Sequence, residues 1–537
     1  MTSSLTFLDL FCGCGGFSLG LERAGLRGLA AIDFNPEAIA VFRANFKDIG
    51  HILQLDLTAF PPAALEALIG TKEVDLIVGG PPCQGFSTAR QVDGSNHGDR
   101  IKADPRRYLY REFLRYVGHF KPKMFVMENV LGMRSASGGT YFSKVQSEAR
   151  ALGYRVHAQL EECVNLGVPQ KRRRQLFIGT RAEFPAYFRP ELKPAPRAVS
   201  GAALWDAIGD LPPLKAGEGE EECEYDLVHR FNMLPYMVSG YLFKVLEVDN
   251  AASLTAHRAR PHSVRDLRDF ERLKEGESSA EAMRRGVEFE FPYDKSSFKD
   301  RYTRQHRKRL CSTIVAHLAK DGLMFIHPTQ NRSLTPREAA RIQSFPDWFH
   351  FPIARTHQFR VIGNAVPPLV GEAVGLAVKA YLENSIQMTK IIDFDLKPLP
   401  KDETEAVTWL LPLLDLDARA LRKIPNADFK RAWFAIGFIY MGLHPDSALD
   451  HGTKVVSDAK DYPPVSQIDP RLCNPYYEQS GWPVVLAPIA KEARRRCKRG
   501  LLDDEEYYCC DAQMAGACFR NPVLIDEVRR GRKVYAS

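Results

Sequence analysis

Several features that would place the chain in a special structural class are missing from its 537 residues. No run of about 18 consecutive apolar residues occurs, which argues against a membrane-spanning helix. The start, MTSSLTFLDLF, has neither the charged region nor the cleavage site of a secretory signal, so we expect an intracellular protein. No internal repeat or low-complexity tract is present. What remains is a globular chain long enough for two or more domains.

The cysteines also lack a regular framework. There are 11 of them, an odd number with irregular spacing, which favours reduced thiols over disulfides. Near the C-terminus, Cys497, Cys509, Cys510 and Cys518 contain no C-x-x-C pair, and their spacing is poor for a closed zinc site. We therefore expect no metal.

The formal net charge of +7 permits a polyanionic partner without requiring one. The stretch RYTRQHRKR (301–309) contains no acid at all, and Arg301 and Arg304 lie within it. Such a run forms either a solvated face or a surface that contacts phosphates.

Short apolar runs alternate with helix-like stretches in the first third of the chain. Apolar runs of this kind are typical of strands buried on both faces, and their alternation with helices predicts an α/β fold with a doubly wound, mostly parallel sheet. The predicted strands are 5–11, 28–33, 51–57, 74–80, 124–130 and 173–179, and the predicted helices are 17–25, 36–46, 105–119 and 143–152.

This rhythm ends in a proline-rich stretch, and four segments are predicted on that basis. The first, 1–184, carries the sheet, and 185–330 is irregular and rich in Arg and His. The helical pattern returns in 331–390 and completes the first domain. The extension 391–537 has a different composition and no assigned role, and KEARRRCKRG within it is interpreted as a helix with charged ends rather than a binding code.

A glycine-rich turn, DLFCGCGGFSLG (9–20), joins the first strand to the first helix. Small residues at the carboxyl end of a strand let a ligand approach the backbone, although the spacing is not that of G-x-G-x-x-G. Asp33 ends the next strand and could bind ribose hydroxyls, Phe34 could stack on adenine, and Asp56 could meet its amino group. Turn formation and helix capping are the alternative roles for both acids.

Two further stretches end strands that face the same edge of the sheet. In GGPPCQGFS (79–87), Cys83 lies in a Pro/Gly loop, a position that favours a nucleophile over a buried, inert cysteine. In MENV, Glu128 follows an apolar run and is expected to be partly desolvated, as suits a general acid, or else to be a structural carboxylate.

The stretch QKRRR (170–174) places Arg172 and Arg174 on one face of a strand and Arg173 on the other. Paired arginines suit a grip on a carboxylate, a base edge or a phosphate. A solvent-facing edge strand is the alternative.

Together these stretches resemble the cytosine carbon-5 DNA methyltransferase family of the bacterial type, in family order from about residue 5 to 380. DLFCGCGGFS resembles its cofactor loop, GGPPCQGFS its catalytic loop, ENV its base-binding strand and QKRRR its Gln-x-Arg-x-Arg block. RSLTPREAARIQSFPD resembles the block after target recognition, and IGNAVPP the closing cofactor block.

The resemblance implies a Rossmann-like methyltransferase sheet, a smaller target-recognition domain at 185–330, and a reaction on a flipped cytosine. Cys83 would attack ring carbon 6, and Glu128 would hydrogen-bond or protonate ring nitrogen 3. Arg172 would support the base, and Arg174 would position Cys83 and Glu128. Carbon 5 would take its methyl group from S-adenosyl-L-methionine, with no metal involved.

Further residues are carried over by position. The cofactor residues implied are Phe11, Gly13, Gly15, Asp33, Phe34, Asp56, Leu57, Pro81, Asn364 and Val366. Many family members have Glu in place of Asp33. The substrate residues implied are Pro82, Gln84, Ser87, Asn129 and Gln170, with Gln84 and Ser87 on a loop (83–104) that closes over DNA. Candidates for DNA contact in the recognition segment are Arg258, Arg260, Arg301, Arg304 and the stretch 315–322.

The expected partner is double-stranded DNA containing a target cytosine. We further expect a monomer in the cytoplasm of a prokaryote, associated with the nucleoid, with or without a cognate restriction endonuclease. Two alternatives are kept: the same chemistry on tRNA, and a catalytically inactive protein that flips bases.

Overall fold

The chain divides into two compact units, each with dense internal contacts. The first comprises Met1–Leu152, Ala158–Gly179 and Leu192–Ala377, and the second comprises Gly153–His157, Thr180–Glu191 and Val378–Ser537. The computed structural model describes residues 4–82, 108–181, 190, 192–238, 240–291, 302–320, 322–395, 403–414, 416–442, 487–497, 499 and 501. The predicted boundaries at 184, 330 and 390 stay predictions.

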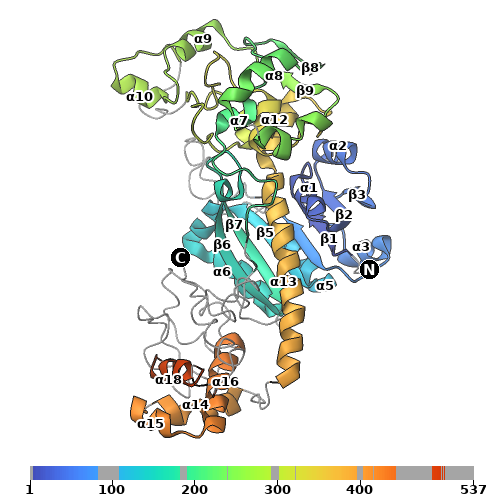
Figure 1. Ribbon diagram of the computed structural model, residues 1–537. Coiled ribbons are helices and arrows are strands. Elements are labelled where there is room, and N and C mark those ends of the chain that lie inside the picture. The colour runs from blue at the N-terminus through green and yellow to red at the C-terminus, as the bar shows by residue number, and fades with distance from the viewer. Residues whose placement is uncertain are drawn as a thin grey trace. The chain divides into compact units, whose positions relative to one another are not determined.

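A seven-stranded sheet organises the N-terminal part, with the strand order β3-β2-β1-β4-β5-β7-β6 (Figure 1). Its strands are β1 (Thr6–Leu10), β2 (Arg27–Asp33), β3 (His51–Gln54), β4 (Leu76–Gly79), β5 (Met124–Val130), β6 (Tyr154–Glu162) and β7 (Arg173–Arg181). The pairs β1–β2, β2–β3, β1–β4 and β4–β5 are parallel. The mostly parallel α/β sheet predicted from the alternation is confirmed.

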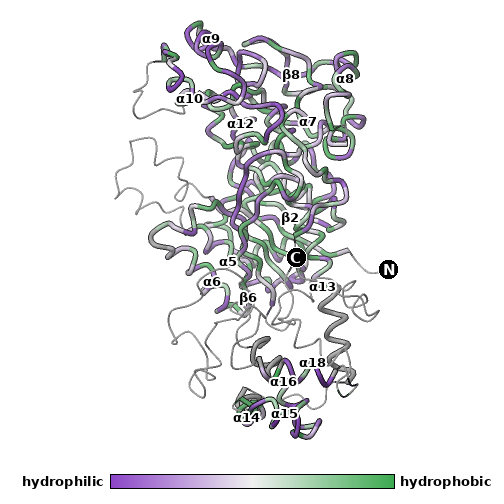
Figure 2. The backbone as a smooth tube through the Cα atoms, turned by 60° about the vertical axis from the view of Figure 1, so that its left-hand side comes forward, coloured by the Kyte–Doolittle hydropathy of each residue, from purple (hydrophilic) through white to green (hydrophobic). Residues whose placement is uncertain are grey.

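Helices follow most of the strands, as a doubly wound sheet requires. They are α1 (Gly16–Arg23), α2 (Pro36–Asn45), α3 (Pro62–Ile69), α5 (Leu109–Phe120) and α6 (Thr140–Ala151). The strands form the core because their apolar runs are buried on both faces: Phe7, Leu8 and Leu10 of β1 are 0% exposed. Figure 2 shows the same concentration of hydrophobic residues in the sheet, whereas α9 is hydrophilic.

After residue 330 come the helices α11 (Pro336–Ile342), α12 (Arg355–Asn364) and α13 (Pro368–Asp395). The sequence predicted that the helical pattern returns in 331–390, and it does; residues 365–367 separate α12 from α13, because proline has no backbone N–H to donate. By length and composition the stretch 355–382 could cross a membrane, yet 83% of its most apolar window is buried inside the structure, as in a core helix.

Helices α1 and α13 cross closely. A Cβ at Gly20 would lie 2.3 Å from the Pro368 carbonyl oxygen, and one at Gly371 would lie 2.7 Å from the Phe17 carbonyl oxygen. Only glycine permits this approach, which brings the chain entering α13 against the start of α1.

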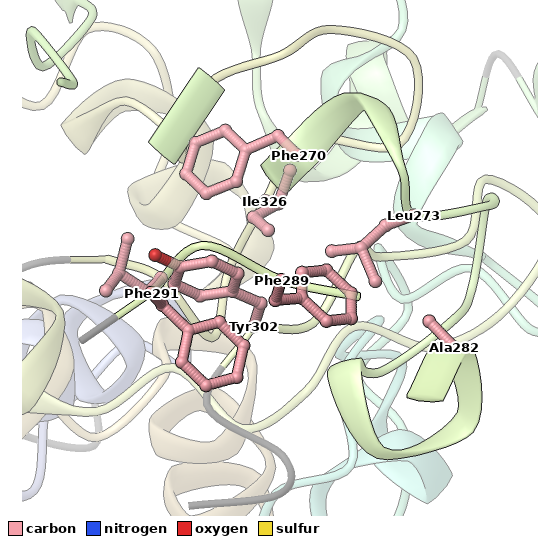
Figure 3. Packing of buried hydrophobic residues seen from close by; sticks show 8 residues of the cluster. Phe270, Leu273, Ala282, Phe289, Phe291, Tyr302 and Ile326 are labelled. Carbon is pink, nitrogen blue, oxygen red and sulfur yellow. The ribbon is translucent and has the colours of Figure 1, made fainter. Parts of the chain in front are cut away.

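The segment between β7 and α11 contains short helices and strands, and residues between 270 and 326 form a small hydrophobic core. These elements are α7 (Leu204–Ile208), β8 (Gly219–Cys223), α8 (Leu227–Met233), β9 (Leu254–Arg258), α9 (Val264–Glu271) and α10 (Ser279–Arg284), and β8 pairs antiparallel with β9. Aromatic side chains form the core (Figure 3): the Tyr302 ring lies 5.5 Å from the Phe270 ring and 5.2 Å from the Phe291 ring, centroid to centroid. Edge-to-face packing of this kind gives a loop-rich segment a defined shape.

Beyond α13 lie α14 (Glu403–Leu414), α15 (Ala418–Lys423), α16 (Asn426–Gly442) and α18 (Ala487–Cys497). The side chains of Leu410, Leu421, Phe429 and Trp433 are 0% exposed, so these helices share a hydrophobic interior. The helix predicted in KEARRRCKRG is confirmed as part of α18.

Candidate active site

The strand order reverses between β1 and β4, which is where doubly wound sheets bind ligands at the carboxyl ends of their strands. The glycine turn follows β1, the GGPP segment follows β4, and Glu128 lies near the end of β5. Neighbouring strands are about 4.8 Å apart, so these three segments share one edge of the sheet. The sequence-based prediction that they meet is confirmed.

Asp33 ties the end of β2 to the glycine turn. Its Oδ2 accepts the Gly13 N–H at 2.9 Å, and its Oδ1 accepts the Asn35 N–H at 2.8 Å. Burial raises the pKa of Asp33. Phe34 beside it is 64% exposed, an unusual state for a large aromatic side chain at a sheet edge.

Asp56 and Leu57 lie at the neighbouring strand end, because the Leu55 N–H donates to the Asp33 carbonyl oxygen at 3.0 Å. Asp56 Oδ1 accepts the N–H and the hydroxyl of Thr58 at 2.9 and 2.8 Å, which is the turn-forming role named as the alternative. Leu57 is buried, and its carbonyl oxygen accepts a hydrogen bond from Arg115.

The closing block meets the glycine turn from the other side. A Cβ at Gly16 would lie only 2.2 Å from the Val366 carbonyl oxygen, so the two backbones are in direct contact. Asn364 at the end of α12 is exposed. These segments fit an adenosyl ligand in three respects. The backbone at Gly13 is open, because a Cβ there would have no atom beyond its chain neighbours within 4 Å. Asp33 supplies a carboxylate, and Phe34 supplies an exposed ring.

Gly13 provides a direct test of this fit. Its φ of +56° is left-handed, so Gly13→Ala is expected to cost about 1–2 kcal/mol of stability. The new methyl group would also occupy the open space, and we expect binding of S-adenosylmethionine to weaken by about tenfold or more, equivalent to about 1.4 kcal/mol. Gly70→Ala is the matched control, since Gly70 has a φ of +72° with equally open surroundings and ends α3. Thermal unfolding and calorimetric titration measure both effects; equal ligand affinities in the two variants would contradict the placement.

Glu128 is held by Arg174. The Arg174 Nε lies 2.6 Å from Glu128 Oε1, and both side chains are nearly buried, at 12% and 11% exposure. A Cβ at Gly80 would lie 3.3 Å from Glu128 Oε2, so the start of the GGPP segment runs along this carboxylate. The pair fixes Glu128 beside the loop that leads to residue 83.

Asn129 links the same two strand ends. Its Nδ2 donates to the Pro81 carbonyl oxygen at 3.2 Å, and its Oδ1 accepts the Val130 N–H at 2.9 Å. Pro81 is buried and Pro82 half-buried. The structure therefore brings together Pro81, Glu128, Asn129 and Arg174, as predicted.

Cys83, Gln84 and Ser87 lie outside the described residues, as does the loop that contains them. The thiols of five other cysteines are described, and all five are free: Cys12, Cys14, Cys163, Cys223 and Cys311. Burial raises the pKa of each, to about 12 for Cys14 and about 11 for Cys163. A thiol of raised pKa is a poor nucleophile, so none of these five suits that role.

Gln170 and Arg172 contact other segments. Gln170 Oε1 accepts the Ile314 N–H at 3.0 Å, and its Nε2 donates to Gln343 Oε1 at 2.7 Å. Arg172 donates to the carbonyl oxygens of Ile314 and Ala365 at 3.0 and 2.8 Å. Both side chains are buried and join β7 to the recognition segment and the closing block. Their contact with the target base stays a prediction.

Asp9 is a buried site residue that the sequence reasoning missed, although an acid inside the apolar run LTFLDLF was a signal. It lies in β1 just before the glycine turn, and its Oδ2 accepts the Ser18 hydroxyl at 2.6 Å. Burial raises the pKa of Asp9 to about 7.

Asp9 should make the stability depend on pH. The folded pKa lies above the ordinary value of 3.8, so the stabilising contribution is full below that value and is lost as the pH rises through 7. Relative to Asp9→Asn, the wild-type protein should lose up to about 4 kcal/mol between pH 4 and pH 8. Denaturant unfolding at a series of pH values measures this, with the exposed Asp249→Asn as control. A constant difference between wild type and Asp9→Asn would refute the assignment.

Two of the basic residues proposed for DNA contact have structural roles instead. Arg304 is 5% exposed and donates to the carbonyl oxygens of Phe270 and His327 at 2.7 and 3.0 Å. Arg260 donates to the carbonyl oxygens of Leu318 and Ala319 at 3.0 and 3.1 Å. Arg258 is exposed, and Arg301 lies outside the described residues. The interpretation of Arg304 as part of a phosphate-contacting surface is therefore wrong.

Comparison with known proteins places this site in a family. Residues 5–380 match the model of the C-5 cytosine-specific DNA methylases. The type II methyltransferase M.DdeI of Desulfomicrobium norvegicum is 34% identical over 71% of this chain and 90% of its own length. The type II methyltransferase M1.HphI of Haemophilus parahaemolyticus is 33% identical over 70% of this chain and 87% of its own.

Among solved structures, a DNA modification methyltransferase encoded within a prophage of E. coli aligns with a TM-score of 0.55 and 26% identity. The alignment covers 71% of this chain and all of that one. The Rossmann-like methyltransferase fold is thereby confirmed. The chain belongs to the C-5 cytosine-specific DNA methylase family and is a site-specific DNA cytosine-5 methyltransferase that uses S-adenosyl-L-methionine.

Proposed function

We propose that the chain is the methyltransferase of a type II restriction–modification system and that Cys83 is its nucleophile. The target cytosine is flipped out of the duplex into the crevice beside Glu128. Pro82 and Asn129 shape the base pocket, Gln170 supports it, and Gln84 and Ser87 belong to the loop that closes over DNA.

The proposed reaction begins when the Cys83 thiolate forms a bond to ring carbon 6. Glu128 donates a hydrogen bond or a proton to ring nitrogen 3, which stabilises the negative charge placed on the ring. Arg174 positions Glu128, and Arg172 supports the base through the segments it joins. S-adenosylmethionine, when bound, supplies the methyl group to carbon 5. Carbon 5 then loses its proton to water, the electrons of that bond expel Cys83 from carbon 6 as thiolate, and nitrogen 3 returns to Glu128 any proton that it took.

The cofactor residues proposed are those at the carboxyl ends of β1 to β4 and in the closing block. They are Phe11, Gly13, Gly15, Asp33, Phe34, Asp56, Leu57, Pro81, Asn364 and Val366. Asp33 would bind ribose hydroxyls through the lone pairs that its two backbone hydrogen bonds leave unused.

The observation that carries the proposal is the Arg174–Glu128 pair at 2.6 Å beside the GGPP segment. The nearly buried Glu128 lies beside the segment that leads to Cys83 and would supply the acid. The open glycine turn at the same edge of the sheet would bind the cofactor. We further propose a monomer in the cytoplasm that is associated with the nucleoid, with or without a cognate restriction endonuclease; the similarity to bacterial type II methyltransferases supports the bacterial setting.

Expression in a host that lacks DNA methylation tests the proposal. Bisulfite sequencing of that host's genome is expected to reveal methylcytosine at one short motif. Methylation of tRNA without methylation of DNA would favour the RNA alternative. An unmodified genome, together with tight DNA binding, would favour an inactive protein that flips bases.

A further inference from the structure

The helices beyond α13 lie outside the family match, which ends at residue 380. They nevertheless form a packed element, with Leu421, Phe429, Trp433, Ile489 and Ala493 all 0% exposed. The family match therefore assigns no role to this packed segment.

Arg496 determines which face of α18 is exposed. Its Nη2 donates to the carbonyl oxygens of Leu421 and Ile424 at 3.0 and 2.9 Å, which fastens α18 to the end of α15. Its Nε donates to Glu492 Oε1 at 3.0 Å, and its guanidinium lies 4.1 Å from the centre of the Phe429 ring. Residues 489, 492, 493 and 496 are therefore buried, and Lys491 points to solvent.

Both helices of this joint carry exposed cations. Arg419, Arg422 and Lys423 of α15 are exposed, as are Lys491 of α18 and Arg499 just beyond it. Hydrophilic stretches at α15 and α18 are visible in Figure 2.

The acids of α16 and α18, and the acid that caps α15, already have partners. Asp417 caps the N-terminus of α15, Asp428 lies 3.9 Å from Arg431, and Glu492 is buried against Arg495 and Arg496. Within the part of the chain that the structure describes, no ion pair involves Arg419, Arg422, Lys423, Lys491 or Arg499. Their positive charge is thus available to a partner.

The scarcity of exposed hydrophobic side chains near these cations indicates which kind of partner could bind them. Among the described residues beyond 380, Leu501 is the one exposed large hydrophobic side chain. Protein interfaces usually need buried apolar or aromatic anchors, and single-stranded nucleic acid needs exposed aromatic rings for stacking. Among the described side chains beyond residue 380, no aromatic ring is exposed, and the single leucine Leu501 does not form an apolar patch. Lys and Arg without such anchors suit the phosphates of a duplex, the polyanion on which this enzyme acts.

We propose that the surface formed by Arg419, Arg422, Lys423, Lys491 and Arg499 binds the phosphate backbone of duplex DNA outside the target sequence. It acts as a second, sequence-independent DNA-binding surface that holds the enzyme on its substrate. The inference rests on DNA being the substrate and not on the residue roles proposed for the reaction.

The test compares two triple variants of the full chain. Arg422→Gln/Lys423→Gln/Lys491→Gln removes three charges from the proposed surface. Arg27→Gln/Lys47→Gln/Lys72→Gln removes three exposed charges near the amino ends of the strands, at the opposite edge of the sheet from the glycine turn. The probe is a duplex of A·T pairs alone, which contains no cytosine to flip. Fluorescence anisotropy at a series of salt concentrations gives affinity and its salt dependence.

We expect the first variant to bind this duplex about tenfold more weakly at 0.1 M salt. The slope of log affinity against log salt should fall by about 0.9 for each phosphate that the variant no longer neutralises. The control should match the wild type in slope. The kcat on cytosine-containing DNA should stay unchanged in both variants, and KM for DNA should rise in the first alone.

A charge-preserving variant, Arg422→Lys/Lys423→Arg/Lys491→Arg, controls for structural damage caused by substitution at these three positions. It should keep the wild-type slope. Equal slopes in the wild type and the first variant would overturn the proposal, and so would a reduced slope in the charge-preserving variant. Four acids, Asp503–Glu506, follow in the sequence outside the described residues, so only the full chain is a fair test. Because the duplex lacks cytosine, this result is independent of whether methyl transfer occurs.

Discussion

Cys83→Ser is expected to lower the rate of methyl transfer by about 10⁴-fold or more, as removal of a covalent nucleophile usually does. Serine is nearly the same size, but its hydroxyl is far less ionised than a thiol and attacks the ring poorly. Binding of DNA and of S-adenosylmethionine should stay within a few-fold of the wild-type values, because neither depends on the thiolate. Single-turnover assays with tritiated cofactor separate the chemical step from binding.

Cys163→Ser is the matched control for that variant. Cys163 is 0% exposed, its N–H donates to the Arg172 carbonyl oxygen at 2.9 Å, and burial raises its pKa to about 11. It lies near the site yet is a poor nucleophile, so its replacement should leave the rate within a few-fold. If Cys83→Ser kept wild-type activity while Cys163→Ser abolished it, the nucleophile would have been assigned to the wrong cysteine.

The second large effect is expected for Arg174→Met. The substitution keeps the length of the side chain but removes the cation that holds Glu128 at 2.6 Å, and it leaves a nearly buried carboxylate without its partner. General acid catalysis contributes about 10²–10⁴-fold, so we expect kcat to fall by about 10²–10³-fold. The KM for S-adenosylmethionine should change little, because the cofactor residues lie on other strand ends.

Arg173→Met tests whether any arginine in QKRRR would have the same effect. The Arg173 side chain is 50% exposed and pairs with the equally exposed Glu162 at 3.2 Å. Exposed pairs contribute about 0–1 kcal/mol, so this variant should be nearly as active as the wild type. An equal fall of kcat in both variants would indicate damage to β7 rather than removal of the specific ion pair with Glu128.

The parts of the fold that depend on local pattern were predictable. The predicted strand 124–130 coincides with β5, and the predicted helix 36–46 differs by one residue from α2. Within the sheet and the helices that cover it, β6 and α3 were not predicted. β6 carries polar residues within YRVHAQLEE, which hides its strand character, and α3 follows two prolines in a short stretch of eight residues. Both depend on packing against neighbours that a local pattern does not contain.

For the candidate site, too, local features were predictable and long-range contacts were not. Cysteine, glutamate and glycine positions at strand ends were predicted to meet because parallel strands end at a common edge, and the structure places Pro81, Glu128 and Asn129 together there. The partners of Gln170, Arg172 and Arg304 were not predictable. Ile314 and Ala365 are 142 and 193 residues away from Arg172 in the sequence, and no local pattern encodes such long-range pairing.

Trapping with 5-fluorocytosine tests the central claim most directly, once bisulfite mapping has supplied the target sequence. Fluorine at carbon 5 cannot leave as the proton does, so the bond between sulfur and carbon 6 should persist after methyl transfer. We predict a denaturation-resistant complex of enzyme and DNA, with the modified peptide containing Cys83, and no such complex for Cys83→Ser. Methyl transfer to the natural duplex without any trapped adduct, or an adduct that survives in Cys83→Ser, would contradict the account.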